Sequence, residues 1–268
     1  MLTPQEIRQY VQETGVRKVN LSLGRSFVLS IIAGAYIAFA AIGSSVASFA
    51  LENPSAAALA FGAVFTVGLI MIIVAGGELY TGNTLIAVAV MNKQVTPLRY
   101  LLNLSLVLAG NYVGGFTVAT LACLAHVPAK GTGALAVYIM SKGLTKMQMD
   151  PAVAFFSGIL CNLLVSLAVW MTYGAKDISG KVWAAFFPIL LFATSGYEHV
   201  VANSYFLPAA KLIAQNPSWV ALAPSVGESL NQLSWLAQLN SIIPVALGNL
   251  IGGITISLIY ELGYGSRK

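Results

Sequence analysis

Three long runs of the sequence contain no charged side chain. They cover residues 26–51, 53–77 and 152–175. An α-helix needs about 20 consecutive apolar residues to cross the hydrocarbon core of a bilayer, and each run meets that length. The chain as a whole is 57% hydrophobic and 9% charged, whereas soluble domains have about 25% charged residues. The sequence therefore predicts an all-α integral membrane protein, with no segment polar enough to form a soluble domain.

The remaining apolar segments complete a set of six predicted spans. A polar segment over 1–20 precedes them, and Thr3-Pro-Gln-Glu6 at its start is typical of a helix capping box. We therefore expect a short amphipathic helix there, lying on the membrane surface. A second short interface helix is expected over 134–142. The six predicted spans cover residues 27–50, 55–91, 98–125, 152–173, 182–214 and 239–262.

Two of these spans are interrupted by glycine beside ionisable residues. The second contains Ala75-Gly-Gly-Glu-Leu-Tyr-Thr-Gly-Asn-Thr84, and the fifth contains Phe192-Ala-Thr-Ser-Gly-Tyr-Glu-His-Val-Val-Ala-Asn203. Irregular backbone at membrane depth is tolerated only where it is buried in protein or lines a cavity. Ionisable residues at that depth usually mark a substrate or proton pathway. Paired interruptions in corresponding halves of a chain therefore indicate a transport site.

The two halves also match beyond these interruptions. Gly110-Asn-Tyr-Val-Gly-Gly115 in the third span corresponds to Gly248-Asn-Leu-Ile-Gly-Gly253 in the sixth. Three spans in each half make the two repeats inverted relative to the membrane, so that the interrupted spans face each other. We predict one transmembrane channel domain over 1–268, with a first repeat over 26–125 and a second over 152–262.

Three ionisable residues lie within the interruptions. We expect Glu78 and Glu198 to be structural, because a buried carboxylate can accept hydrogen bonds from backbone N–H groups that an interrupted helix leaves free. A cation site built on the two glutamates is the competing interpretation. His199 titrates near pH 6.5 when unperturbed, within about a unit of neutrality, which makes it the natural proton donor or acceptor at mid-membrane.

Several uncharged polar residues lie near the interruptions or within apolar spans. Asn83 and Asn203 follow the two interruptions, and Thr81 lies within the first. An amide within an apolar span needs a partner or a pore, and this applies to Asn111, Asn162 and Asn249.

The basic residues predict the orientation. Both termini are placed on the cytoplasmic side, because cytoplasmic loops carry an excess of lysine and arginine. Lys146, just before the fourth span, would then draw anions into an outer vestibule. A net charge of +5 is explained by this bias and does not indicate a nucleic-acid partner. With this orientation ten basic residues are inside (Arg8, Arg17, Lys18, Arg25, Lys93, Arg99, Lys176, Lys181, Arg267, Lys268) and four outside (Lys130, Lys142, Lys146, Lys211).

The two cysteines, Cys123 and Cys161, lie in apolar segments without CxxC spacing. We therefore expect no disulfide framework, no metal site and no cofactor.

The glycine-rich and glutamate-containing motifs closely resemble the formate/nitrite transporter family. They are Gly-Gly-Glu-Leu-Tyr-Thr-Gly-Asn at 76–83, Gly158-Ile-Leu-Cys-Asn-Leu-Leu-Val, Ala193-Thr-Ser-Gly-Tyr-Glu-His and Pro244-Val-Ala-Leu-Gly-Asn. The resemblance implies an aquaporin-like fold with helices 2 and 5 broken. It also implies a homopentamer in the cell membrane with one pore per protomer, for small monovalent anions.

The same resemblance implies roles for individual residues. His199 corresponds to the family's central pore histidine, and Thr81 to the threonine of the loop that breaks helix 2. Lys146 corresponds to the outer vestibule lysine and Asn162 to the pore asparagine of helix 4. Leu79 and Tyr80 fall in the inner constriction, and Phe65 and Phe192 in the outer one. Formate members read Asp-Leu-Phe-Thr-Ser where this chain has Glu78-Leu-Tyr-Thr-Gly. This is closer to nitrite-type members, apart from Tyr80 in place of phenylalanine, so nitrite and hydrosulfide are candidates beside formate.

Three other functions stay open on the sequence. A channel for water or glycerol would share the fold without needing His199 or Lys146. A cation-coupled transporter would use Glu78 and Glu198 as ligands. A membrane enzyme would need a nucleophile or a metal cluster, which two histidines 73 positions apart do not supply, and we expect no enzymatic activity.

Overall fold

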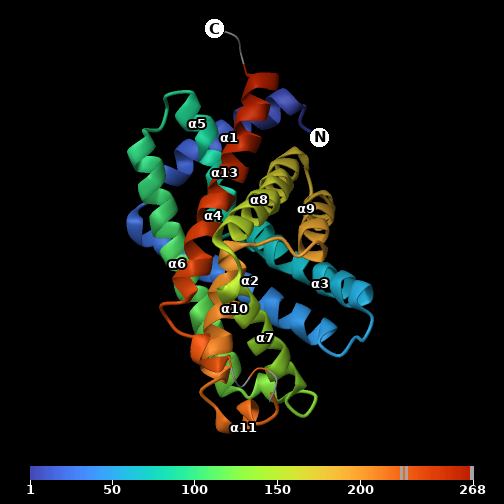
Figure 1. Ribbon diagram of the computed structural model, residues 1–268. Helices are drawn as coiled ribbons and strands as arrows, with labels where there is room; N and C mark the ends of the chain where they lie inside the picture. Colours follow the sequence, from blue (N-terminus) through green and yellow to red (C-terminus); the bar gives the residue numbers. More distant parts are fainter. Residues whose placement is uncertain (224–225, 227–228, 266–268) are drawn as a thin grey trace.

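The computed structural model of the chain describes residues 1–223, 226 and 229–265, and is helical (Figure 1). The described part contains no strand. Arg267 and Lys268, which contribute to the predicted charge asymmetry, lie outside the described residues. The helices are α1 (Pro4–Val19), α2 (Leu23–Ser48), α3 (Pro54–Ala75), α4 (Tyr80–Asn83), η1 (Thr84–Ile86), α5 (Ala87–Met91), α6 (Pro97–Leu124), η2 (Val127–Ala129), α7 (Ala134–Gln148), α8 (Pro151–Gly174), α9 (Ile178–Thr194), α10 (Val200–Ile213), α11 (Pro217–Val220), η3 (Leu230–Gln232) and α13 (Gln238–Tyr264).

The prediction of six spans is confirmed. Five helices are long and apolar enough to cross a membrane alone, namely α2, α3, α6, α8 and α13. The fifth span consists of α9 and α10 in succession, and α3 is continued in the same way by α4, η1 and α5. Six crossings return the chain to the side on which it began. Figure 1 accordingly shows the N-terminus, α1 and the last turns of α13 at the same end of the molecule.

The packing of the helices repeats between the two halves. In the first half α2 packs against α3 and α6, and in the second half α8 packs against α9 and α13 in the corresponding way. The halves join where α3 contacts α9. Each broken span also sends its second part across to the other half, because α10 packs against α6 and α2 while α4 packs against α8. This exchange brings the two interruptions together inside the bundle.

The first interruption is shorter than the sequence predicts. The helix after α3 resumes at Tyr80, and not at Thr84, so the extended segment covers only 76–79. The predicted interruption was too long because Gly82 and the neighbouring threonines do not break the helix, which tolerates both. The backbone leaves helical geometry at Gly76 and Gly196. Their φ angles of 98° and 71° lie in the left-handed region that glycine adopts without steric cost.

Two other helix boundaries differ from prediction. The interface helix over 134–142 is in fact the 15-residue α7, which runs to Gln148 and packs against α10. The last turns of α7 were not predicted because Lys142 and Lys146 lower the mean hydropathy of this segment, although the face of the helix towards α10 is apolar. The fifth span starts at Ile178, where Asp177 caps α9, and not at 182. The capping box at the start of α1 is present as predicted: Thr3 N–H donates to Glu6 Oε2 at 2.7 Å.

Candidate functional site

An asparagine on α6 holds the first interruption in place. Asn111 Oδ1 accepts a hydrogen bond from the Tyr80 N–H at 2.9 Å. Its Nδ2 donates to the carbonyl oxygens of Ser30 at 2.8 Å and Glu78 at 2.9 Å. The amide thus replaces the backbone partners that the broken helix lacks and ties the extended segment to α2. A buried backbone group without such a partner is costly, which explains why an amide lies in this apolar span.

An asparagine on α13 does the same for the second interruption. Asn249 Oδ1 accepts from the Val200 N–H at 3.0 Å, and Nδ2 donates to the carbonyl oxygens of Gly158 at 2.8 Å and Glu198 at 3.0 Å. The three contacts correspond one by one to those of Asn111, with α8 in the place of α2. This correspondence is the inverted repeat at the level of single hydrogen bonds.

Each glutamate forms an ion pair with a lysine and a hydrogen bond with an asparagine. Glu198 Oε1 accepts from Lys146 Nζ at 2.7 Å, and Oε2 accepts from Asn203 Nδ2 at 2.9 Å. The glutamates were predicted to accept hydrogen bonds from the freed backbone, and this is wrong. The backbone N–H groups of Tyr80 and Val200 donate to the asparagines on α6 and α13 instead. Both oxygens of each carboxylate accept hydrogen bonds from lysine and asparagine side chains.

The first interruption contains the equivalent ion pair, with a lysine from α1. Lys18 Nζ donates to Glu78 Oε1 at 2.8 Å and to Asn83 Oδ1 at 2.9 Å, while Asn83 Nδ2 donates to Glu78 Oε2 at 2.7 Å. The sequence interpretation missed Lys18, which it treated only as one of the cytoplasmic charges. No local signal indicates it: the two residues are 60 positions apart, and only the structural pair of Lys146 with Glu198 shows what the inverted repeat requires of Glu78.

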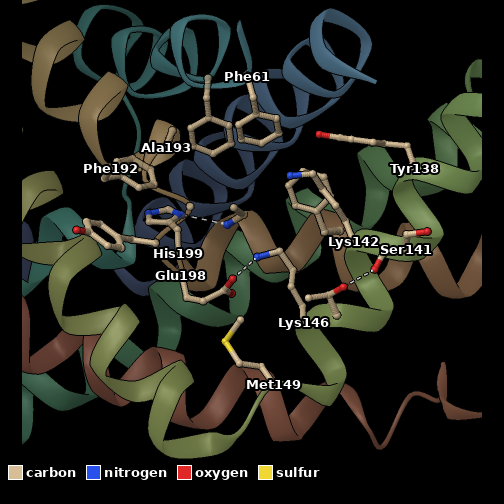
Figure 2. A pocket seen from close by; sticks show the side chains of 16 residues that line it. Phe61, Tyr138, Ser141, Lys142, Lys146, Met149, Phe192, Ala193, Glu198 and His199 are labelled. Carbon is tan, nitrogen blue, oxygen red and sulfur yellow. Dashed lines mark hydrogen bonds and ion pairs between the residues drawn. The ribbon is translucent and has the colours of Figure 1, made fainter. Parts of the chain in front are cut away.

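Two cavities enter the protein from opposite ends towards the interruptions. We call the first the Lys146 cavity: it has a volume of about 380 Å³ and is lined by α3, α7, α9 and α10 (Figure 2). We call the second the Lys18 cavity, with a volume of about 400 Å³. The described lining of the Lys146 cavity includes Lys142, Lys146 and Glu198. That of the Lys18 cavity includes Lys18, Lys181 and Glu78. Each cavity therefore has two lysines and one glutamate, a net charge of +1.

A small apolar chamber lies between the two cavities. Its volume is about 10 Å³, roughly the space of one water molecule. Phe65, Phe192 and His199 line both the chamber and the Lys146 cavity. Leu79 lines both the chamber and the Lys18 cavity. A solute that crosses between the cavities must therefore leave nearly all of its water behind.

An aromatic cluster closes the Lys146 side of this chamber. The rings of Phe65 and Phe192 meet edge to face with their centroids 5.8 Å apart, and Phe192 lies 5.8 Å from the His199 ring. Figure 2 shows the imidazole of His199 beside the ring of Phe192. A hydrophobic constriction of this kind gates by excluding water.

The hydrogen bonds of His199 assign its tautomer. The ring acts as the N-cap of α10, with Nδ1 accepting from the Ala202 N–H at 3.1 Å. A nitrogen that accepts a hydrogen bond holds no proton, so the neutral imidazole has its proton on Nε2. Nε2 lies 3.1 Å from Thr81 Oγ1. The histidine therefore presents a donor to Thr81 at the meeting point of the two broken helices.

Three predicted path residues are absent from the described linings of these cavities, namely Thr81, Tyr80 and Asn162. Tyr80 turns away, and its hydroxyl donates to the Ala246 carbonyl oxygen at 3.0 Å. Asn162 Nδ2 donates to Thr84 Oγ1 at 3.1 Å and to the Asn249 carbonyl oxygen. Tyr80 and Asn162 both hold neighbouring helices around the interruptions.

The family model described as formate/nitrite transporter matches residues 5–262. The chain belongs to this family. It is 32% identical over 259 residues to the formate channel FocA of Haemophilus influenzae, which covers 94% of this chain and 90% of that protein. It is 33% identical over 268 residues to a probable formate transporter of Methanothermobacter thermautotrophicus, covering 92% and 91%.

The fold is that of a solved structure described as a pentameric formate channel with formate bound. The TM-score is 0.83 at 30% identity, covering 90% of this chain and 97% of that one. Membership of a family of transporters confirms a multi-pass membrane transport protein and decides against the membrane-enzyme alternative.

Proposed function

We propose that the chain forms a transmembrane path for small monovalent anions, with formate, nitrite and hydrosulfide as the candidates. The observation that carries this proposal is the pair of cavities, each with a net charge of +1 among its described lining residues, on either side of the chamber. Cavities lined by one sign of charge concentrate ions of the opposite sign. The names of the two relatives and of the solved structure support formate in particular.

The same geometry disfavours a path for cations. Glu78 and Glu198 each have both carboxylate oxygens occupied by a lysine and an asparagine. A sodium ion bound to either carboxylate would have to displace an ammonium group that is already in contact. A path for water or glycerol would not need the excess positive charge in both cavities.

An anion in the small apolar chamber needs a hydrogen-bond donor, and His199 lines this chamber. An ion that leaves water for an apolar site loses its hydration, and hydrogen-bond donors or neutralisation must offset that cost. Nε2–H of His199 is the donor in the chamber wall, and Thr81 lies within hydrogen-bonding distance of it. We infer that the anion accepts this hydrogen bond, or the proton itself, as it passes Phe192 and before it reaches Leu79.

The proposal is tested by measuring uptake of formate, nitrite and hydrosulfide into proteoliposomes of the purified protein. We expect uptake of at least one anion well above that of protein-free vesicles, unchanged when sodium is replaced by potassium. Vesicle swelling in glycerol measures neutral-solute passage in the same preparation. Uptake that requires sodium, or swelling in glycerol without anion uptake, would contradict the proposal.

The orientation follows from charge. We infer that the chain lies in the cell membrane as one channel domain, with α1 and both termini on the cytoplasmic side. In this orientation the Lys146 cavity opens outwards and the Lys18 cavity inwards. The support is the distribution of the fourteen basic residues, ten of which then lie inside.

A homopentamer with one path in each chain is the assembly that we infer. Many large apolar side chains lie exposed on the outer faces of the spans, among them Leu102, Phe156, Phe187 and Leu258. They need lipid or neighbouring copies as cover, and the similar structure is described as pentameric. Mass measurement in mild detergent is expected to give five times the 28.2 kDa of one chain. A monomer that is stable in detergent and conducts after reconstitution would show that assembly is dispensable.

A further inference from the structure

Lys142 lies on the same face of α7 as Lys146, one turn earlier, and lines the same cavity. Its Nζ lies 4.2 Å from the ring centroid of Phe61, 5.1 Å from that of Tyr138 and 5.8 Å from that of Phe206. The rings come from α3, α7 and α10, so three helices form a cage around one ammonium group. Figure 2 shows the side chain directed towards Phe61.

The cage differs chemically from the ion pair of Lys146. Aromatic rings attract a cation through their faces but provide no oxygen to accept its N–H donors. Lys146, by contrast, donates to Glu198 at 2.7 Å, and the two charges cancel. Within the described residues Lys142 makes no ion pair and no hydrogen bond to an oxygen. The excess positive charge of the Lys146 cavity is therefore that of Lys142.

We propose that Lys142, held by Phe61, Tyr138 and Phe206, is the binding site for a small carboxylate or nitrite ion in the Lys146 cavity, ahead of the aromatic constriction. This rests on the proposed function and names the residue that receives the anion. An ammonium group has three donors, and a charge-assisted hydrogen bond to an anionic oxygen is stronger than its attraction to a ring. Ser141, which lines the same cavity, adds a hydroxyl group to the site, whereas the Thr145 hydroxyl donates to the Ser141 carbonyl oxygen at 3.0 Å.

The protonation of Lys142 makes the site sensitive to pH. Its pKa is lowered to about 8, first by burial, then by the positive charge of Lys146, against the opposing effect of Glu198. Lys142 is therefore mainly charged at pH 7 and mainly neutral at pH 9. Arginine keeps its charge throughout this range. The titratable groups that line the same cavity are Tyr138, Lys146, Tyr197, Glu198 and His199.

The test compares Lys142→Met with the parent in proteoliposomes at low ionic strength. Methionine retains an unbranched apolar side chain and removes the charge. We expect the half-saturating formate concentration to rise about threefold to tenfold, with maximal uptake unchanged. Lys142→Arg is expected to match the parent at pH 7 and, unlike the parent, to hold its half-saturating concentration at pH 9. Lys130→Met, which alters an exposed lysine away from the cavity, is the matched control.

A second measurement does not depend on transport. Acetic anhydride acetylates neutral amines, and the modified lysines are identified by peptide mass spectrometry on the detergent-solubilised protein at pH 8. Sodium formate is expected to protect Lys142 but not Lys130, whereas sodium gluconate at equal ionic strength protects neither.

The outcomes separate this inference from the proposed function. An unchanged half-saturating concentration in Lys142→Met, or equal acetylation of Lys142 with and without formate, overturns the binding site even if the parent conducts. Protection of Lys142 in a parent that carries no anion would support the binding site while removing the proposed function. Maximal uptake and the mass of the assembled protein show whether each variant is folded.

Discussion

Replacing Asn249 by alanine is expected to lower the free energy of unfolding by about 3–9 kcal/mol, because three buried backbone groups each lose a partner at about 1–3 kcal/mol. Those groups are the Val200 N–H and the carbonyl oxygens of Gly158 and Glu198. Water cannot replace the amide readily in a fully buried site within the membrane. Asn249→Ala is therefore expected to reduce both assembly and the denaturant midpoint.

The inverted repeat extends this prediction to the other half. Asn111→Ala removes the corresponding partners of Tyr80, Ser30 and Glu78, so a loss of similar size is expected. Asn240→Ala is the matched control, since it removes an exposed amide from the same helix as Asn249 and should change stability by less than about 0.5 kcal/mol. Unfolding by sodium dodecyl sulfate in mixed micelles, followed by circular dichroism, measures all three. A parent-like midpoint for Asn249→Ala would mean that the second interruption is held by other contacts.

Much of the architecture could be predicted from the sequence because the membrane restricts the choices. An uncharged run such as 152–175 has one stable outcome in a bilayer, and α8 confirms it. The paired interruptions were also predictable, because glycine and glutamate inside apolar runs contradict an ordinary span. His199 and Thr81 lie within these interruptions, whereas the expected roles of Phe65 and Phe192 came from the resemblance to the family.

The contacts within the site could not be predicted in the same way. Lys18 reaches Glu78 across 60 positions, and nothing local to either residue indicates the pair. The cage around Lys142 likewise combines rings from three helices. Periodicity places a residue on a face of its helix, whereas the identity of its partner depends on how helices cross. Tyr80 illustrates the limit, because Leu79 next to it in sequence lines the path, while the Tyr80 hydroxyl donates to the Ala246 carbonyl oxygen.

His199→Asn is expected to separate the structural role of the histidine from its role in transport. The Oδ1 atom of asparagine can accept the hydrogen bond from the Ala202 N–H that Nδ1 now accepts, since asparagine is among the best N-cap residues. It cannot take up a proton between pH 5 and 8. Parent uptake, corrected for protein-free vesicles, is expected to rise as the pH falls through this range. The asparagine variant is expected to show a flat profile and a channel-like leak of the anion.

His199→Phe provides the opposite change. It removes both the N-cap and the Nε2–H donor and places a larger apolar ring against a chamber of about 10 Å³. The loss of one hydrogen bond to a charged group, worth about 1.5–3 kcal/mol, corresponds to about a 10- to 100-fold lower rate, and the added bulk lowers it further. Formate uptake between pH 5 and 8 measures both variants. If the asparagine variant keeps the pH profile of the parent, His199 exchanges no proton with the anion, and its contribution is the cap of α10 together with a neutral hydrogen bond.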